Sequence, residues 1–354
     1  MKDLFRLDGK VAVVIGGAGG IGQGIAGAMA FYGAEVVIAS RKMESLVRAK
    51  SEIKEKVGKD VAIYTVDATN EDSIIALVNT VVSNHKKADI LVNAQGYNKK
   101  FSLFDFPMDV MADMMNVNVI GVAMACKHFG KVMKENGYGR IINLSSVRGV
   151  RAFSGGGGNM GYCTSKGAVD MLTRTLAAEL GPEVTVNAIG PTLTVTPMMA
   201  EVIKEHPETL NLGNGKPLER IGKVEDCMGP AVFLASEAGA FVTGQILYPD
   251  GGLTAIGGGR KSGYGLHFIQ TDAASVCNLP GIRGGLQTQL PGSAPDQSVH
   301  LPALFWADGT GLPDPLSRTV RYRGAYRCDG GRHFGRRGQN RLQADCGHRR
   351  RNRD

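Results

Sequence analysis

Cysteine is scarce in this sequence and is not arranged for metal binding. The six cysteines among the 354 residues form no CxxC pair and show none of the spacings typical of a zinc site. Without a disulfide or metal framework in the pattern, the expectation is a reduced, cytoplasmic protein that holds no metal.

A leader segment and a long apolar run are also missing from the pattern. No basic stretch followed by an apolar stretch opens the chain, and no apolar run looks long enough to span a bilayer. The sequence therefore predicts neither export nor contact with a membrane. Its length allows one large α/β domain with an appendage, or two domains.

Glutamate is absent from the last part of the chain. Residues 257–354 contain fourteen Arg, one Lys, seven Asp and no Glu, so they carry the whole net charge of +8. The first 256 residues hold 26 basic and 26 acidic side chains and are neutral. A neutral domain does not favour binding of nucleic acid, which needs a basic field over the folded part.

Residues 257–354, here called the tail, also lack any sustained period of 2 or 3.6. Gly, Pro and Arg are abundant there, whereas Lys exceeds Arg by 18 to 8 in the preceding residues. G+C-rich DNA read in a wrong frame yields such a composition, so we interpret the tail as frameshift-derived or disordered. The alternative is a basic RNA-binding arm, which would need aromatic interleaving or a repeated motif. One folded domain is therefore predicted over residues 1–256.

Short apolar runs alternate with helical patterns through these first 256 residues. Most of the runs are apolar throughout, as in parallel strands covered by helices on both faces. Seven runs are predicted as strands: Val11–Gly16, Glu35–Ala39, Val61–Val66, Asp89–Ala94, Arg140–Ser146, Val184–Gly190 and Gln245–Gly252. Helical patterns cover Gly22–Tyr32, Asp72–Asn84 and Tyr162–Leu180. The alternation predicts an α/β fold, a doubly wound parallel sheet of the Rossmann type with helices on both faces.

The first predicted strand runs into a glycine-rich turn, GGAGGIG, at residues 16–22. Glycines at a strand-to-helix turn let the backbone approach a pyrophosphate, whose charge then meets the N-terminus of the helix. Glycine-rich turns are common, but this one follows the first strand and opens a helix. It therefore predicts a dinucleotide-binding site.

The end of the second predicted strand bears on which dinucleotide is bound. An acidic residue there would bond the ribose hydroxyls and repel a 2′-phosphate, whereas an arginine would accept that phosphate. This sequence has Ser40, Arg41 and Lys42 at that point and no carboxylate. The pattern favours NADP(H) over NAD(H), although Arg41 could also be a solvated residue at a helix start.

Tyr162 and Lys166 in the stretch GYCTSK lie one helical turn apart, directly after the glycines SGGGG at 154–158. Such a pair can be a surface tyrosine beside a solvated lysine. Beside a nicotinamide it would be an acid and base, since an adjacent ammonium lowers the pKa of a phenol. A hydroxyl at the end of a neighbouring strand would then hold the carbonyl oxygen. The glycines would form a pliable substrate loop, or slack without function.

These residues, in this order, resemble the short-chain dehydrogenase/reductase family over about residues 7–257. The resemblance implies a nicotinamide-dependent oxidoreductase that acts on a small molecule, and a homotetramer. It also implies cofactor contacts at Gly16, Gly20, Ile21, Gly22, Asp67, Ala68, Asn93, Gly96, Pro191, Thr194 and Thr196, besides Tyr162 and Lys166. Ile15, Ala94, Gln95 and Thr192 depart from the family pattern, at positions that do not react.

The catalytic residues that the resemblance implies are Asn118, Ser146, Tyr162 and Lys166. Ser146 is preferred over Ser145 because a glycine follows it three residues later, at Gly149. A lid is expected at about residues 198–217. An intact set of this kind disfavours a cofactor-binding regulator that no longer turns over.

Basic residues near the expected pocket point to a small anionic polyol as substrate. Lys99 and Lys100 follow the turn NAQG, and Arg148 and Arg151 follow Ser146. A carboxylate bound near the nicotinamide could pair with any of them, although each could also be a solvated surface charge. The region from Asp226 to Gly257 resembles the gluconate 5-dehydrogenases and related sugar-acid members. The alternatives are a 3-oxoacyl-carrier-protein reductase and a reductase of another small ketone.

Overall fold

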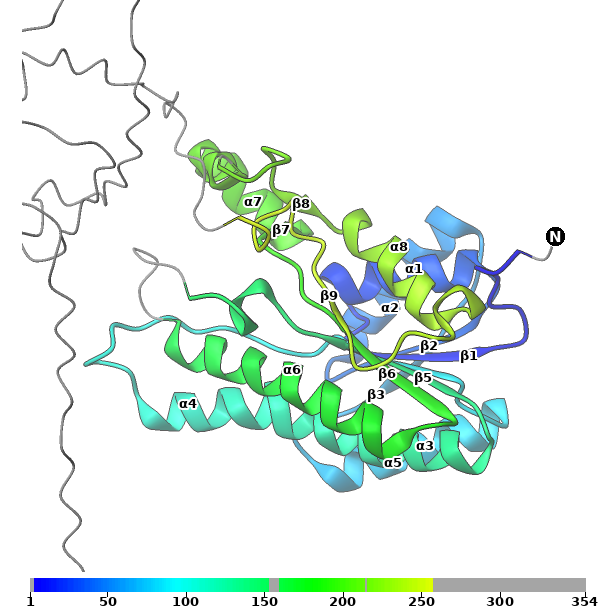
Figure 1. Ribbon diagram of the computed structural model, residues 1–354. Helices are drawn as coiled ribbons and strands as arrows, with labels where there is room; N and C mark the ends of the chain where they lie inside the picture. The colour runs from blue at the N-terminus through cyan, green and yellow to red at the C-terminus, as the bar shows by residue number, and fades with distance from the viewer. Residues whose placement is uncertain (1–2, 153–158, 214, 257–354) are drawn as a thin grey trace, which may run out of the picture. The chain divides into compact units, whose positions relative to one another are not determined.

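A computed structural model describes residues 3–152, 159–213 and 215–256 (Figure 1). Two regions discussed above, the glycines at 154–158 and the tail at 257–354, lie outside these described residues. The prediction of a single domain over residues 1–256 therefore stays a prediction with respect to the tail.

One seven-stranded sheet forms the centre of the fold. Its strands are β1 (Val11–Ile15), β2 (Glu35–Ser40), β3 (Ala62–Thr65), β4 (Ile90–Asn93), β5 (Gly139–Leu144), β6 (Val184–Ile189) and β9 (Ile246–Leu247). They lie in the order β3-β2-β1-β4-β5-β6-β9, and every neighbouring pair is parallel. The predicted fold class, a doubly wound sheet of the Rossmann type, is confirmed.

Helices cover both faces of the sheet, as Figure 1 shows. On one face α1 (Gly20–Phe31), α2 (Met43–Val57) and α8 (Glu225–Ala235) bury Ala12 and Val14 of β1. On the other, α3 (Glu71–His85), α5 (Gly121–Glu135) and α6 (Met160–Leu180) cover Val11, Val13 and Ile15 of the same strand. Successive strand residues thus enter opposite apolar layers, which explains why the strands are apolar throughout.

The last predicted strand is much shorter than its sequence pattern. Gln245–Gly252 was expected to be extended, but β9 covers only Ile246–Leu247. The chain turns directly afterwards, because Gly251 and Gly252 have φ values of +68° and +86°. Asp250 caps that turn, since its carboxylate accepts hydrogen bonds from the backbone amides of Gly252 and Thr254. The turn brings residues 248–256 toward the site described below.

Several short elements follow β6 that the sequence pattern did not predict. They are β7 (Thr194–Val195), α7 (Pro197–Glu205), the 3₁₀ turn η3 (Pro207–Gly213) and β8 (Gly222–Lys223). Strands β7 and β8 pair in parallel as a separate two-stranded sheet. A two-residue strand has no hydrophobic period, so its sequence carries no signal of it.

A continuous helical stretch, Met108–Glu135, joins α4 (Met108–Met115), the π-helical turn η1 (Asn116–Ile120) and α5. By length and composition alone it could cross a membrane, so the expectation of no such run does not hold here. The core helix of a soluble protein passes the same test. Ala125, Phe129 and Met133 of α5 are fully buried in the layer beneath the sheet, while 33% of the most apolar window of the stretch is buried.

The order of the strands fixes where a ligand can bind. The chain winds outward from β1 through β2 to β3, and then outward again on the other side from β4 to β9. Where the winding reverses, between β1 and β4, the loops at the carboxyl ends of the strands separate and leave a crevice. The glycine-rich turn after β1 and the NAQG turn after β4 both lie at that point.

Candidate active site

A cleft of about 1340 Å³ opens at the carboxyl ends of the central strands. Its lining comes from the glycine-rich turn, the segments after β4, β5 and β6, the start of α6, and the segment before β8. Ser146, Tyr162 and Lys166 share this cleft with Gly20, Ile21, Gly22 and Gly96. Sequence segments separated by more than a hundred residues therefore meet in one cavity.

The glycines at 16–22 fit a bound pyrophosphate. A Cβ at Gly22 would lie 2.4 Å from the Gly16 carbonyl oxygen, and one at Gly16 would lie 2.6 Å from the Ala94 backbone. Gly22 thus lets α1 pack closely on the turn, and Gly16 lets the segment after β4 approach it. Gly19 lines the cleft and has nothing within 4 Å of such a Cβ, so the space before the helix is open. The N-terminus of α1 faces that space and would attract phosphate.

Lys166 is buried beneath the cleft and held by the end of β5. It is 4% exposed, and its Nζ donates a hydrogen bond of 2.6 Å to the Leu144 carbonyl oxygen. Burial lowers the pKa of this ammonium to about 8, and the carboxylate of Asp170, one turn along α6, acts in the opposite direction. A lysine in this state can release or take up a proton near neutral pH.

The tyrosine pKa differs from the expectation drawn from the sequence. The adjacent ammonium was expected to lower it, but burial dominates and raises the pKa of Tyr162, with a hydrogen bond to Ser146 opposing the rise. The Lys166 Nζ lies 5.6 Å from the centroid of the Tyr162 ring and is bonded to Leu144. In this state Tyr162 is therefore a protonated phenol that holds its proton more tightly than a solvated tyrosine does.

The two serines after β5 have different surroundings. Ser146 makes the hydrogen bond with Tyr162, and its Oγ also contacts the Pro191 carbonyl oxygen at 3.4 Å. Ser145 instead donates to the buried carboxylate of Asp170, which also accepts a hydrogen bond of 3.1 Å from the Tyr248 hydroxyl. Both serines line the cleft, and the choice of Ser146 as the catalytic serine stays a prediction that its hydrogen bond with Tyr162 favours. Asp170 was not singled out there, although its position four residues after Lys166 is the signal.

Asn118 occupies the π-helical turn between α4 and α5 and is fully buried. A π turn inserts an extra residue and so rotates a side chain out of the regular helical register. The Asn118 amide exchanges two hydrogen bonds of 3.0 Å with the backbone of Tyr97 and donates a third to Ser165 Oγ. It thereby ties the turn after β4 to α6. A Cβ at Gly96 would lie 3.1 Å from Asn118 Oδ1 and 3.5 Å from Lys166 Nζ.

Some predicted cofactor residues do not line the cleft. Asn93 is fully buried, and its side-chain amide donates to Asn143 Oδ1 at 2.9 Å and to Cys126 Sγ at 3.3 Å. Its side-chain amide is thus engaged in the core, and the predicted contact with the cofactor stays a prediction. Gly16 lies just behind the lining. Ser40, Arg41, Lys42, Asp67 and Ala68 lie at the ends of β2 and β3, outside the lining of the cleft.

Arg41 and Asp67 are close enough to affect each other. Hydrogen bonds from the Thr69 side chain and backbone lower the pKa of Asp67, and the Arg41 guanidinium lowers it further. Arg41 is exposed at the start of α2, next to the open end of the glycine-rich turn. The end of β2 carries Ser40 and not an aspartate, which would repel a 2′-phosphate bound by Arg41.

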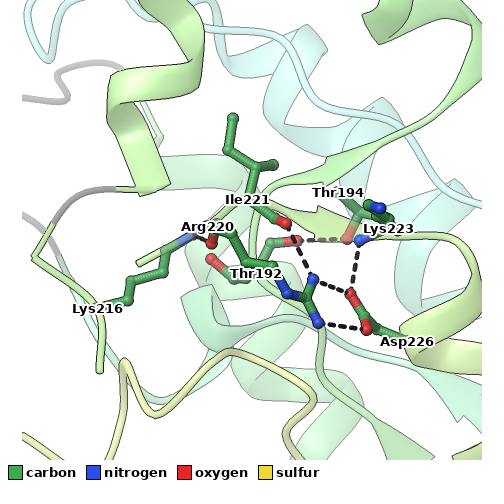
Figure 2. A network of polar contacts seen from close by, with 7 residues as sticks. All are labelled: Thr192, Thr194, Lys216, Arg220, Ile221, Lys223 and Asp226. Atoms are coloured by element: carbon green, nitrogen blue, oxygen red, sulfur yellow. Dashed lines mark hydrogen bonds and ion pairs between the residues drawn. The ribbon is translucent and has the colours of Figure 1, made fainter. Parts of the chain in front are cut away.

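The segment after β6 also lines the cleft, as the sequence predicted for Pro191, Thr194 and Thr196. The Pro191 carbonyl accepts a hydrogen bond of 3.1 Å from the Val147 amide, so this segment is joined to the loop after Ser146. Thr194 Oγ1 donates to the Thr192 carbonyl at 2.9 Å, as Figure 2 shows. Residues 193–226, apart from residue 214, are called the lid segment below.

Of the four basic residues singled out from the sequence, two line the cleft and two do not. Lys100 and Arg148 line the cleft. Lys99 is exposed and is not among the lining residues, and Arg151 donates to the carbonyl oxygens of Leu253 and Ile256 at the end of the described chain. Structure adds lining residues that the sequence analysis missed: Gln23, Arg48, Glu52 and Lys216. No pattern at those positions marks them, because they meet the cleft only through folding.

Comparison with known sequences places the chain among oxidoreductases. Residues 16–254 match the family model described as enoyl-(acyl carrier protein) reductase. Gluconate 5-dehydrogenase of Gluconobacter oxydans (strain 621H) is 35% identical over 253 residues, which cover 71% of this chain and 97% of that protein. The 3-oxoacyl-(acyl-carrier-protein) reductase of Thermotoga maritima is 34% identical over 253 residues, which cover 70% of this chain and 99% of that protein.

A solved structure of a protein named as an oxidoreductase is also similar to this chain. A protein of Beutenbergia cavernae, provisionally named as an NAD(P)-dependent gluconate 5-dehydrogenase, superimposes with a TM-score of 0.65 at 31% identity. The match covers 72% of this chain and all of that one, which was crystallised with NADP at low occupancy.

Proposed function

The chain belongs to the short-chain dehydrogenase/reductase family, and from that premise we propose an NADP(H)-dependent oxidoreductase that interconverts a secondary alcohol and a ketone on a small sugar acid or polyol. Gluconate and 5-ketogluconate are the leading pair. The observation that carries the proposal is that Ser146, Tyr162 and Lys166 share one cleft with the basic side chains of Lys100 and Arg148.

The proposed reaction uses the side chains of the cleft for proton transfer and positioning. The nicotinamide supplies or accepts the hydride when it is bound. In the direction of reduction, the Tyr162 hydroxyl gives its proton to the substrate oxygen while Ser146 holds that oxygen in place. The buried ammonium of Lys166 favours the phenolate that remains. Asn118 fixes the backbone of Tyr97, beside Lys166 and Gly96.

The preference for NADP(H) rests on the end of β2. Arg41 is exposed there, and the strand ends in Ser40 instead of a carboxylate. A guanidinium at this position can bind a 2′-phosphate, and β2 itself does not end in the carboxylate that would repel that phosphate. The NADP found in the similar structure from Beutenbergia cavernae supports the proposal.

The substrate proposal is supported by the gluconate 5-dehydrogenase relative and by the basic lining. A second candidate is reduction of a 3-oxoacyl group on a carrier protein, favoured by the relative from Thermotoga maritima. The neutral charge of residues 1–256 counts against docking of an acidic carrier. Reduction of another small ketone and a non-catalytic regulatory role are the remaining alternatives. A cytoplasmic homotetramer completes the proposal.

The test follows nicotinamide absorbance with the full-length protein, D-gluconate and either NADP⁺ or NAD⁺. Oxidation that prefers NADP⁺, with the preference lost in Arg41→Ala, supports both the substrate and the role of Arg41. Turnover of 3-oxoacyl substrates without turnover of gluconate would favour the second candidate. A matched chain ending at Gly257 shows whether the tail affects activity, and sequencing the DNA near that residue tests the frameshift.

A further inference from the structure

Lys216 is a buried cation in the wall of the cleft. It precedes Pro217 in the lid segment, lines the same cavity as Ser146 and Tyr162, and is 3% exposed. Lys100, by comparison, lines the cavity but is exposed to solvent. A buried ammonium is expensive unless an anion or several hydrogen bonds compensate it.

The described residues give this ammonium little compensation. Its Nζ donates one long hydrogen bond of 3.5 Å to the Arg220 carbonyl oxygen, as Figure 2 shows, and it forms no ion pair among the described residues. Asp250 attracts it from a distance, but both oxygens of that carboxylate already accept backbone hydrogen bonds from Gly252 and Thr254. Burial correspondingly lowers the pKa of Lys216. The side chain has donors left for an anion in the cleft.

The backbone around Lys216 is fixed by a clamp of polar contacts (Figure 2). Arg220 donates two hydrogen bonds, of 2.6 and 2.7 Å, to the two oxygens of Asp226 at the start of α8. The Gly222 amide donates to the Leu193 carbonyl at 3.0 Å, which holds β8 beside β7. Closer to Lys216, the Leu218 amide donates to the Gly251 carbonyl at 3.1 Å. The chain that directly follows Lys216 is thus held in place at Leu218, Arg220 and Gly222.

We propose that Lys216 determines substrate specificity by binding the carboxylate of the substrate, so that the enzyme prefers an acid over the corresponding neutral polyol. The inference rests on the proposed function and deepens it. A carboxylate placed between Lys216 and the reacting carbon would restore the interactions that the buried ammonium lacks. The distance along the cleft from Ser146 and Tyr162 to Lys216 would select the length of the substrate.

The experiment compares Lys216→Met, which keeps the length of the side chain and removes its charge, with Lys216→Arg, which keeps the charge. Lys223→Met is the matched control, because Lys223 is an exposed lysine of the same segment outside the cleft lining. Gluconate and the neutral polyol D-sorbitol are compared as substrates of the full-length enzyme. Cofactor affinity and melting temperature are measured for each variant.

Lys216→Met is expected to raise KM for gluconate by about 10- to 100-fold, with kcat and the KM for sorbitol changed little. Lys216→Arg should retain part of the affinity, and Lys223→Met all of it. An equal loss for gluconate and sorbitol, or no loss for either, overturns the inference. A loss of cofactor affinity alone also overturns it and assigns the lysine to a cofactor phosphate.

A second readout separates failure of this inference from failure of the proposed function. If the wild type oxidises sorbitol but not gluconate, the sugar-acid function is wrong. Competitive inhibition of sorbitol oxidation by gluconate, and by shorter carboxylates such as glycerate, then tests Lys216 directly. If a carboxylate inhibits the wild type and Lys216→Met abolishes this inhibition, Lys216 binds an anion even though gluconate is not the substrate. Binding of carboxylates to the wild type is also measured by calorimetry, on the enzyme saturated with NADPH. If no carboxylate inhibits or binds the wild type, Lys216 does not bind a substrate carboxylate.

Discussion

Ser145, Lys166 and Asp170, beneath the cleft, are each less than a twentieth exposed and bond to one another or to the backbone of β5. On the lid side, Lys216 depends on a clamp whose ion pair, Arg220 with Asp226, is about half and a quarter exposed. The first set lies directly after a core strand and on a long helix, and the second on short elements between β6 and α8. The proposed proton chemistry thus rests on core elements, whereas the proposed substrate contact rests on short elements held by a partly exposed ion pair.

The largest expected effect of breaking this arrangement is at Tyr162. Tyr162→Phe removes the only proposed proton donor but leaves the ring and its burial. We expect kcat to fall by roughly 10²- to 10⁴-fold with cofactor affinity preserved, as for loss of a general acid. Stopped-flow or steady-state assays at saturating substrate measure it. Unchanged turnover would remove the proton-transfer role from this residue.

A pair of glycine substitutions tests how tightly the core side is packed. In Gly22→Ala the new Cβ would lie 2.4 Å from the Gly16 carbonyl oxygen, whereas in Gly19→Ala it would meet nothing within 4 Å. Gly19 also has an extended φ of 176°, which alanine adopts without strain. We expect Gly22→Ala to lose about 1–3 kcal/mol of unfolding free energy and Gly19→Ala almost none. Chemical denaturation of both variants decides between them.

The pH dependence of reduction should report the buried pair Lys166 and Asp170. The pKa of Lys166 is lowered to about 8 by burial, and Asp170 opposes that change. Since the ammonium is needed, the rate of ketone reduction should fall as the pH rises through about 8. In Asp170→Asn the opposing charge is gone, so the fall should move to lower pH.

Profiles of kcat between about pH 6 and 10 for the wild type and Asp170→Asn provide the measurement, with pH 8 the reference point for Lys166. The other charged or titratable groups that act on Asp170 are Tyr248 and Arg174, so Tyr248→Phe serves as a control that keeps the carboxylate. A shift in that control as large as in Asp170→Asn would show that the hydrogen bond matters more than the charge.

The smallest effect is expected on the lid side. Arg220→Met breaks the two hydrogen bonds to Asp226, an ion pair that is partly exposed to solvent and so contributes little to stability. We expect a melting temperature near that of the wild type, but a KM for substrate raised by about 3- to 10-fold because Lys216 is less well positioned. Asp226→Asn should give the same change, and the double variant no more. Additive effects would show that the two residues act separately.

Sequence patterns predicted the core side of the cleft better than the lid side. The predicted catalytic residues Ser146, Tyr162 and Lys166 fall in dense local patterns, LSS after β5 and YCTSK at the start of α6, and the folded chain brings them into one cleft. The basic residues chosen as substrate contacts were picked by proximity in sequence to those motifs. Of them, Lys100 and Arg148 line the cleft, while Arg151 bonds to the carbonyls of Leu253 and Ile256.

The amino-acid sequence alone determined the doubly wound fold, because continuous apolar strands and amphipathic helices follow from local periodicity. It also predicted Tyr162 and Lys166 as the residues of the proton chemistry, since the pair is one turn apart in a helix and stands in a motif that resembles the family pattern. Only the tertiary structure decided that burial raises the tyrosine pKa, that Asn93 turns into the core, and that Lys216 reaches the cleft. Burial and contacts between distant segments have no local pattern, so they exist only once the chain has folded.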